Sequence, residues 1–306
     1  MTNPNFAWCS HLFAISGSGK TRLALEGLCH NWGFYISCRR QSIGSQSQSS
    51  GSRDFETVTE IMESMSGRDK GEEEICIAKN VDVANRAFAM LLCARVFVLR
   101  HLLKNLPIGV DAMVARQRWV LVQVLPPYIP FCGDIFSHVV KSLRPAQTAP
   151  MLDLARSMLR ELTDIVGDEI FPSERLFSVV DEAQVAAEYL KDSFRSFTTG
   201  RDMRPVLHAF YSFLWRTEIF RGVVLAGTGL SMKMVQTAVS SHAAKHLALR
   251  QDPIVFVEVG RFTKDGTGHE DYIRKYLLLS DNISDQRLLQ RILYWFSGRW
   301  VQLRPS

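Results

Sequence analysis

Apolar residues follow two kinds of pattern along this chain. Some gather in short runs rich in β-branched residues, such as "FSVV", "GVVLA" and "IVFVEV", which predict buried strands. Stretches with helical periodicity separate these runs. The alternation predicts an α/β fold in which helices cover a mainly parallel sheet. The predicted strands are 7–15, 33–37, 176–180, 222–226 and 254–259.

A long segment without strand patterns separates the second strand from the third. Residues 55–170 carry apolar residues at helical spacing, and "LPPYIP" interrupts this pattern once. We therefore predict a helical insertion within a core domain of residues 1–260. The predicted helices of the insertion are 82–105, 112–124, 134–143 and 151–165.

Two other segments stand apart by composition. Residues 41–53 lie in "RRQSIGSQSQSSGSRD", which has too few apolar side chains to offset the entropy of ordering and predicts a mobile loop. Helical patterns at 269–279 and 285–297 predict a C-terminal helical subdomain over 261–306. The sequence stops shortly after Arg299, so we expect this subdomain to be incomplete.

The composition is that of a globular protein: of 306 residues, 46% are hydrophobic and 22% are charged. The net charge of +5 is modest and no basic stripe is present, so we do not expect a nucleic-acid partner. The longest apolar run, "AFAMLLCA", falls short of the roughly 20 residues that span a bilayer, so we expect no membrane segment. Six irregularly spaced cysteines and no secretory signal predict an intracellular protein, cytoplasmic or nuclear.

The stretch "FAISGSGKTRLALEGL" follows a predicted strand and opens a predicted helix. Its glycines permit a tight turn whose backbone amides can approach phosphate oxygens at a helix N-terminus. Lys20 would reach the β- and γ-phosphates, and Thr21 would offer a hydroxyl to Mg²⁺. The spacing is that of a phosphate-binding loop (Walker A) with Ala14 in place of the first glycine, and the alternative is a turn that matches by chance. The predicted nucleotide contacts are Ser16, Gly17, Ser18, Gly19, Lys20, Thr21 and Arg22.

An acidic pair follows the third predicted strand in "LFSVVDEAQ". A nucleotide hydrolase needs one carboxylate for the metal and a second to activate water. Asp181 would hold Mg²⁺ and Glu182 would be the base, as in a Walker B motif. Alternatively, the pair simply begins a helix, where carboxylates are favoured. Together with the glycine-rich loop, the pair predicts Mg²⁺-dependent binding and hydrolysis of a nucleoside triphosphate, with ATP expected.

Other positions could also carry chemistry. Thr228 lies between two glycines after the fourth strand and would sense the γ-phosphate, unless "GTG" is a plain turn. Arg201 and Arg204 in "GRDMRPVL" would act as an arginine finger, unless they are solvated surface residues. His242 and His246 are four positions apart, but the glutamate of H-E-x-x-H and a third ligand are missing, so we expect no zinc site.

Several sequence motifs occur together along nearly the whole chain: "SGSGKTRLALEGLCHNWGFYI", "RWVLVQVLPP", "LFSVVDEAQ", "RPVLHAF", "GVVLAGTGLSM" and "ILYWFSGR". In this order they resemble the P-loop NTPase region of Crinkler-type proteins of fungi and oomycetes. The resemblance implies an ATPase of the additional-strand class, related to signal-transducing and AAA+ NTPases, with strand order 5-1-4-3-2. It does not extend to effector delivery or DNA cleavage. By motif position it implies Lys20 and Thr21 as phosphate and metal contacts, Asp181 and Glu182 as the acidic pair, Thr228 as a sensor and Arg299 as a second sensor.

Two alternatives remain. "AISGSGKT" and "DEAQ" also fit a superfamily 2 helicase, but Lys20 and Asp181 are 161 positions apart and no second RecA-like domain fits in the chain. The other alternative is a nucleotide-dependent switch or interaction module with little turnover, which would act through a second copy or another protein. Glu182 favours hydrolysis over this second alternative.

Overall fold

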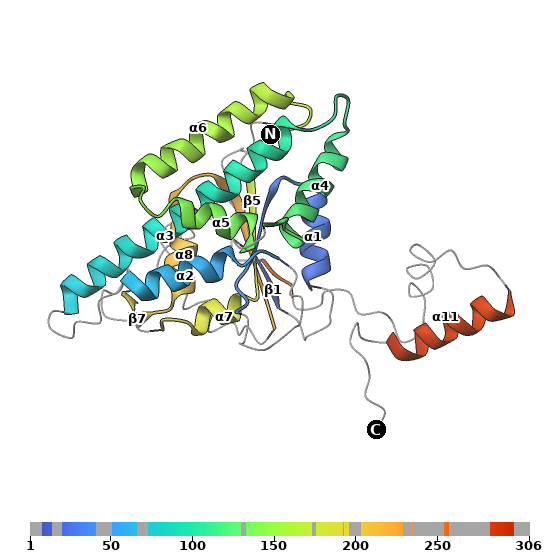
Figure 1. Ribbon diagram of the computed structural model, residues 1–306. Coiled ribbons are helices and arrows are strands. Elements are labelled where there is room, and N and C mark those ends of the chain that lie inside the picture. The colour runs from blue at the N-terminus through green and yellow to red at the C-terminus, as the bar shows by residue number, and fades with distance from the viewer. Residues whose placement is uncertain are drawn as a thin grey trace.

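A parallel sheet of five strands lies at the centre of the fold (Figure 1). Its order is β2-β5-β8-β1-β9, which is the expected order 5-1-4-3-2 read from the other edge, and the predicted α/β class with a parallel sheet is confirmed. The strands are β1 (Trp8–Phe13), β2 (Gly33–Ser37), β5 (Leu176–Asp181), β8 (Phe220–Gly227) and β9 (Ile254–Phe256). The computed structural model describes residues 8–13, 20–40, 51–65, 73–129, 133–172, 176–191, 193–195, 203–228, 234, 254–256 and 282–296.

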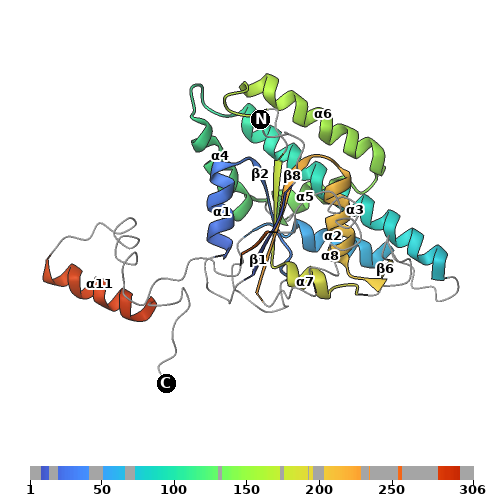
Figure 2. The ribbon, with the colours of Figure 1, turned by 180° about the vertical axis from the view of Figure 1, so that it is seen from behind.

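Helices cover both faces of this sheet (Figures 1 and 2). The insertion contributes α2 (Asp54–Met65), α3 (Glu73–Lys104), α4 (Ala112–Val124), α5 (Ile135–Ser142) and α6 (Thr148–Val166). The other described helices are α1 (Lys20–His30), α7 (Ala183–Glu188), α8 (Val206–Arg216) and α11 (Ile283–Phe296). Two short antiparallel pairs, which the sequence did not predict, are β3 (Tyr128–Ile129) with β4 (Gly133–Asp134) and β6 (Phe194–Arg195) with β7 (Met203–Arg204).

Alternation along β2 divides the core between the two faces, because successive side chains of a strand point in opposite directions. Tyr35 packs in a small cluster with residues of α1 and α4, including Leu28 and Val120. Phe34 and Ile36 belong to the larger cluster, which α2, α3 and α8 complete. Figure 2 shows α1 on one side of the strands and α8 on the other.

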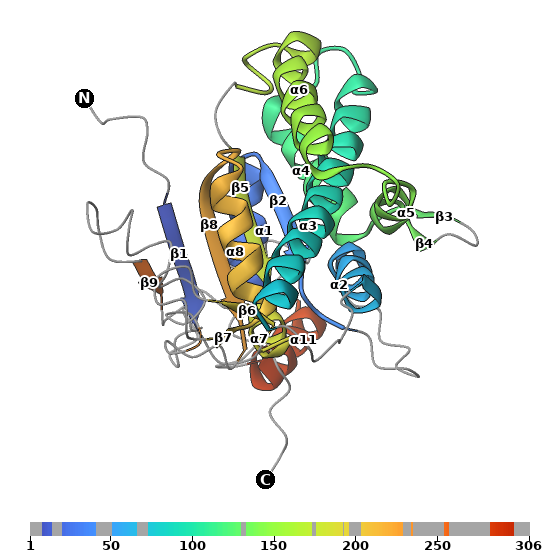
Figure 3. The same cartoon turned by 90° about the vertical axis from the view of Figure 1, so that its left-hand side faces the viewer.

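The four predicted helices of the insertion are confirmed, although α3 and α6 begin earlier than predicted, and α2 was not predicted as a separate helix. α3 begins at Glu73 rather than at 82. The prediction missed its first turns because exposed polar residues such as Lys79 interrupt the apolar pattern there. α6 packs along α3 (Figure 3). Arg100 of α3 and Glu161 of α6 form an ion pair of 2.6 Å between these helices. In the described part of the chain, no helix is both long and apolar enough to cross a membrane.

Residues 51–53, which composition placed in the mobile loop, are held by hydrogen bonds. Gly51 donates from its backbone N–H to the carbonyl of Val124 at 2.8 Å, and the Ser52 hydroxyl donates to Asp134 at 2.7 Å. Gly51 has a φ of 102°, which disfavours any residue with a Cβ. This end of the segment is therefore ordered by contacts that composition does not reveal.

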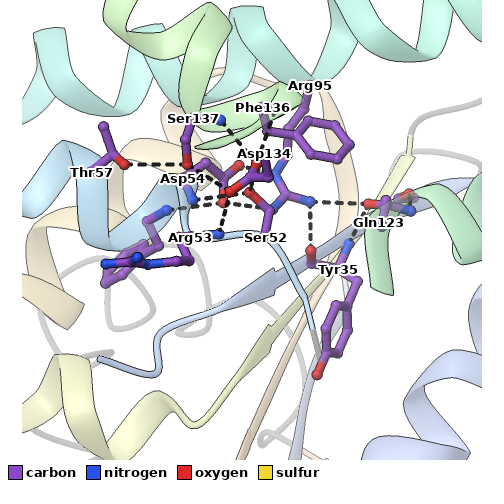
Figure 4. A network of polar contacts seen from close by, with 12 residues as sticks. Tyr35, Ser52, Arg53, Asp54, Thr57, Arg95, Gln123, Asp134, Phe136 and Ser137 are labelled. Atoms are coloured by element: carbon purple, nitrogen blue, oxygen red, sulfur yellow. Dashed lines mark hydrogen bonds and ion pairs between the residues drawn. The ribbon is translucent and has the colours of Figure 1, made fainter. Parts of the chain in front are cut away.

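A buried ion pair follows this segment (Figure 4). Arg95 of α3 donates two hydrogen bonds, at 2.6 and 2.8 Å, to the carboxylate of Asp54 at the start of α2. Both side chains are fully buried. Since an isolated buried charge is very costly, each partner is needed to neutralise the other.

Asp134 caps α5 and collects hydrogen bonds from several donors. Its carboxylate accepts from the backbone N–H groups of Arg53, Phe136 and Ser137 and from the hydroxyl of Ser52. Burial acts to raise the pKa of Asp134, but these hydrogen bonds outweigh it and hold the pKa below its usual value. The ionised carboxylate therefore stabilises the folded state.

Asp134→Asn is expected to lower the free energy of unfolding by about 1–3 kcal/mol near neutral pH, because backbone donors lose a charged acceptor. A lowered pKa in the folded state means that the stabilisation is present above the unfolded value of about 3.9 and is lost as the pH falls below it. The difference between wild type and variant should thus shrink in acid. Denaturant titrations across this pH range measure the difference in the free energy of unfolding. Asp153→Asn, at an exposed position of α6, is the control. An equal difference at all pH values would contradict this role.

Candidate functional site

The candidate residues meet at one edge of the sheet. Because the strands are parallel, their carboxyl ends lie together, and β1 pairs with β8 so that Phe13 is opposite Gly227. Asp181 ends β5, Thr228 follows β8, and α1 begins with Lys20. In open α/β sheets this edge is where ligands bind.

A hydrogen bond between distant segments joins the two predicted motifs. The Thr21 hydroxyl at the start of α1 donates to Oδ2 of Asp181 at 2.9 Å, although the residues are 160 positions apart. The other carboxylate oxygen, Oδ1, accepts from the backbone N–H of Glu182 at 2.9 Å. The structure thus brings together the hydroxyl and the carboxylate that the sequence assigned to the metal.

Asp181 has one partner that the sequence did not suggest. The hydroxyl of Tyr35, on the neighbouring strand β2, donates to Oδ2 at 2.7 Å. Asp181 is 4% exposed and Tyr35 is 2% exposed, so water competes little for this contact. One feature of the sequence is consistent with this contact: Tyr35 places a hydroxyl in the mainly apolar strand "GFYIS".

Lys20 is a buried cation beside the acidic pair. Its side chain is 6% exposed. Burial lowers the pKa of the Lys20 ammonium, while the carboxylates of Asp181 and Glu182 oppose this shift. The site therefore concentrates positive and negative charge in a place with little water, where electrostatic interactions are strong.

Glu182 has a left-handed backbone, with φ 53° and ψ 37°. This conformation is costly for a residue with a Cβ, at roughly 1–2 kcal/mol, and such strain is typical of functional positions. Although Glu182 stands at the N-cap of α7, its side chain makes no capping hydrogen bond. Glu182 thus begins the helix, as the alternative expects, but it does not cap α7 through a side-chain hydrogen bond among the described residues.

Gln184 connects Glu182 to the end of β8. Its amide nitrogen donates to the Glu182 carboxylate. Its amide oxygen is buried and has no hydrogen-bond partner in the described part of the chain. It lies so close to Gly227 that a Cβ there would collide with it. Gly227 thus leaves room for Gln184 to reach the candidate base. In the sequence, Gln184 stands out only as the last residue of "DEAQ", two positions after the candidate base.

The remaining predicted residues are distributed differently. Arg22 pairs with Glu26 at 2.8 Å on the surface of α1, and Thr228 is half-buried. Arg204 lies on β7, just before α8. The first backbone N–H of α8, that of Val206, donates to the carbonyl of Tyr189, which follows α7. The roles of Arg22, Thr228 and Arg204 toward a nucleotide stay predictions. Eight residues named in the sequence analysis lie outside the described residues: Ser16, Gly17, Ser18, Gly19, Arg201, His242, His246 and Arg299.

The oxygen atoms of Thr21 and Asp181 suit Mg²⁺ in a site shared with substrate. Mg²⁺ takes one or two protein carboxylates and completes its shell with water and phosphate oxygens. Among the residues that the structure describes, no cluster of three or more His, Cys, Asp or Glu side chains could hold a metal by itself. Thr21 and Asp181 are therefore a partial ligand set, which Mg²⁺ would complete with other oxygen ligands.

No protein-family model, curated protein or solved structure matches this chain. The resemblance to Crinkler-type proteins accordingly stays an expectation from the quoted motifs. Function is inferred below from the residues that meet at the carboxyl edge of the sheet.

Proposed function

We propose that this protein is a Mg²⁺-dependent P-loop NTPase that binds a nucleoside triphosphate, with ATP expected, and hydrolyses it. The observation that carries the proposal is the hydrogen bond of 2.9 Å between Thr21 and Asp181. It joins the residue after the lysine of a phosphate-loop pattern to the carboxylate at the end of a buried strand. Such a pair is what a shared Mg²⁺–nucleotide site needs.

Binding would use the start of α1. Lys20 is the first residue of this helix, where the helix dipole favours an anion, and its ammonium would contact the β- and γ-phosphates. Thr21 and Asp181 would hold Mg²⁺, which neutralises charge on the phosphates when bound. Thr228, next to the end of β8, would contact the γ-phosphate.

Hydrolysis would use Glu182 as the general base. Its carboxylate takes a proton from water as the water oxygen forms a bond to the γ-phosphorus. The bond from that phosphorus to the bridging oxygen breaks, and the electron pair leaves with the nucleoside diphosphate. Inorganic phosphate is the second product, and the proton on Glu182 returns to solvent.

One observation favours the second candidate, a switch with little turnover. In the structure the Glu182 carboxylate already accepts a hydrogen bond from Gln184. The Gln184 amide thus occupies one of the acceptor positions that the attacking water would need. The protein would then change its affinity for a second copy or for another protein according to the bound nucleotide.

Lys20→Ala tests the proposal directly. Loss of a charge-assisted contact to phosphate is worth about 1.5–3 kcal/mol, so we expect nucleotide affinity to fall about 10- to 100-fold. Equilibrium titration with a fluorescent ATP analogue measures it. Lys79→Ala, on an exposed turn of α3, is the control and should bind like wild type. Equal affinity in wild type and Lys20→Ala would overturn the proposed function.

A further inference from the structure

We infer that Tyr35 is a positioning residue, which holds the carboxylate of Asp181 in the orientation that Mg²⁺ requires. The inference rests on the proposed function, since it concerns the metal of that site. Tyr35 belongs to neither the phosphate-binding loop nor the acidic pair and lies 146 positions from Asp181. Its hydroxyl would touch neither the metal nor the nucleotide and would act through Asp181.

The strand register explains how the hydroxyl reaches its partner. β2 and β5 pair in parallel, with Tyr35 opposite Val179 and Ser37 opposite Asp181. Residues two apart point to the same face of a strand, so Tyr35 and Asp181 are diagonal neighbours on one face. A tyrosine side chain is long enough to span this diagonal, and its hydroxyl oxygen lies 2.7 Å from Oδ2.

Three donors fix the Asp181 carboxylate. Oδ1 accepts from the backbone of Glu182, and Oδ2 accepts from Thr21 and Tyr35. An ionised carboxylate offers about four acceptor sites, so a position is left for a metal or its water. Because Thr21 uses its proton on Asp181, its oxygen lone pairs are available to a cation. If Tyr35 were lost, Thr21 would be the one donor left on Oδ2 among the described residues, although Thr21 must itself face the metal.

The phenol of a tyrosine carries its proton at neutral pH, since its ordinary pKa is about 10. The Tyr35 hydroxyl is therefore a donor, and Oδ2 of Asp181 is its acceptor at 2.7 Å.

The helical insertion fixes the backbone of Tyr35 in turn (Figure 4). Its N–H donates to the side-chain oxygen of Gln123 at 2.8 Å, and its carbonyl accepts from Arg95 at 2.5 Å. β2 is an edge strand, so these side chains of α3 and α4 take the place of a further strand. Figure 4 shows the ring of Tyr35 pointing away from Arg95 and Gln123. The insertion thus holds the backbone, while the hydroxyl is left for Asp181.

Tyr35→Phe removes this hydroxyl and keeps the ring, which packs with Leu28 and Val179. Loss of a partner that orients a metal ligand typically costs about 10- to 100-fold in metal affinity. We therefore expect the Mg²⁺ concentration for half-maximal tightening of a non-hydrolysable fluorescent ATP analogue to rise by about that factor. Affinity for the analogue in EDTA should match that of wild type. Tyr211→Phe, another buried tyrosine, is the control and should leave the Mg²⁺ titration unchanged.

Two results would overturn the inference. The first is a Mg²⁺ titration of Tyr35→Phe that coincides with wild type. The second is an equal loss of affinity in Mg²⁺ and in EDTA, because that shows a structural role only. Tyr35→Leu, which removes the hydroxyl with another apolar shape, must show the same shift and serves if the first variant does not fold. Failure of the proposed function gives a different result, since wild type would then bind no nucleotide in either condition.

Discussion

Glu182→Gln is expected to lower the rate of nucleotide hydrolysis by about 10²- to 10⁴-fold, the usual contribution of a general base. Glutamine keeps the size of the side chain and one oxygen that can accept a hydrogen bond from Gln184, but it cannot take a proton from water. Nucleotide affinity should remain within a small factor of wild type, because Lys20, Thr21 and Asp181 are unchanged. Single-turnover hydrolysis and equilibrium binding, measured on the same preparations, separate the two effects.

Glu188→Gln provides a matched control, because Glu188 is an exposed residue at the other end of the same short helix. Its turnover should equal that of wild type. If Glu182→Gln hydrolysed nucleotide as fast as wild type, Glu182 would not be the base and the hydrolytic assignment would fail. Nucleotide binding without turnover in the wild type would instead favour the switch, in which Gln184 keeps Glu182 from acting.

Arg95→Met is expected to lower the free energy of unfolding by about 3–5 kcal/mol. The substitution leaves the carboxylate of Asp54 buried with no opposite charge. It also removes the hydrogen bond that Arg95 donates to the carbonyl of Tyr35 on the edge strand β2. Denaturant unfolding followed by circular dichroism measures the loss, provided that the transition is two-state.

Two further variants show whether burial is the cause. Arg100 pairs with Glu161 at a site where both side chains are partly exposed, so Arg100→Met should cost only about 0–1 kcal/mol. The double variant Arg95→Met with Asp54→Asn removes both buried charges and should recover part of the lost stability. Equal costs for Arg95→Met and Arg100→Met would show that the buried pair contributes no more than a surface pair.

Local pattern was enough to predict most of the elements that position the site. The apolar runs around Val179 and Val224 are buried on both faces of the sheet, so they stand out in the sequence as β5 and β8. The helices α4 and α5 were equally visible, since α4 begins at a capping aspartate and α5 repeats its apolar residues at helical spacing. Short pairs such as β3 with β4 were missed, because two residues per strand carry no periodicity.

The sequence by itself determined which residues can do chemistry: Lys20 and Thr21 in one motif and Asp181 and Glu182 in another, since the spacing within each motif is local. Only the tertiary structure decided that Thr21 donates to Asp181, that Tyr35 supports the same carboxylate and that Arg95 neutralises Asp54. These contacts join positions far apart in the chain. Strand order and register bring them together, and the free energy of burying the sheet under its helices sets both.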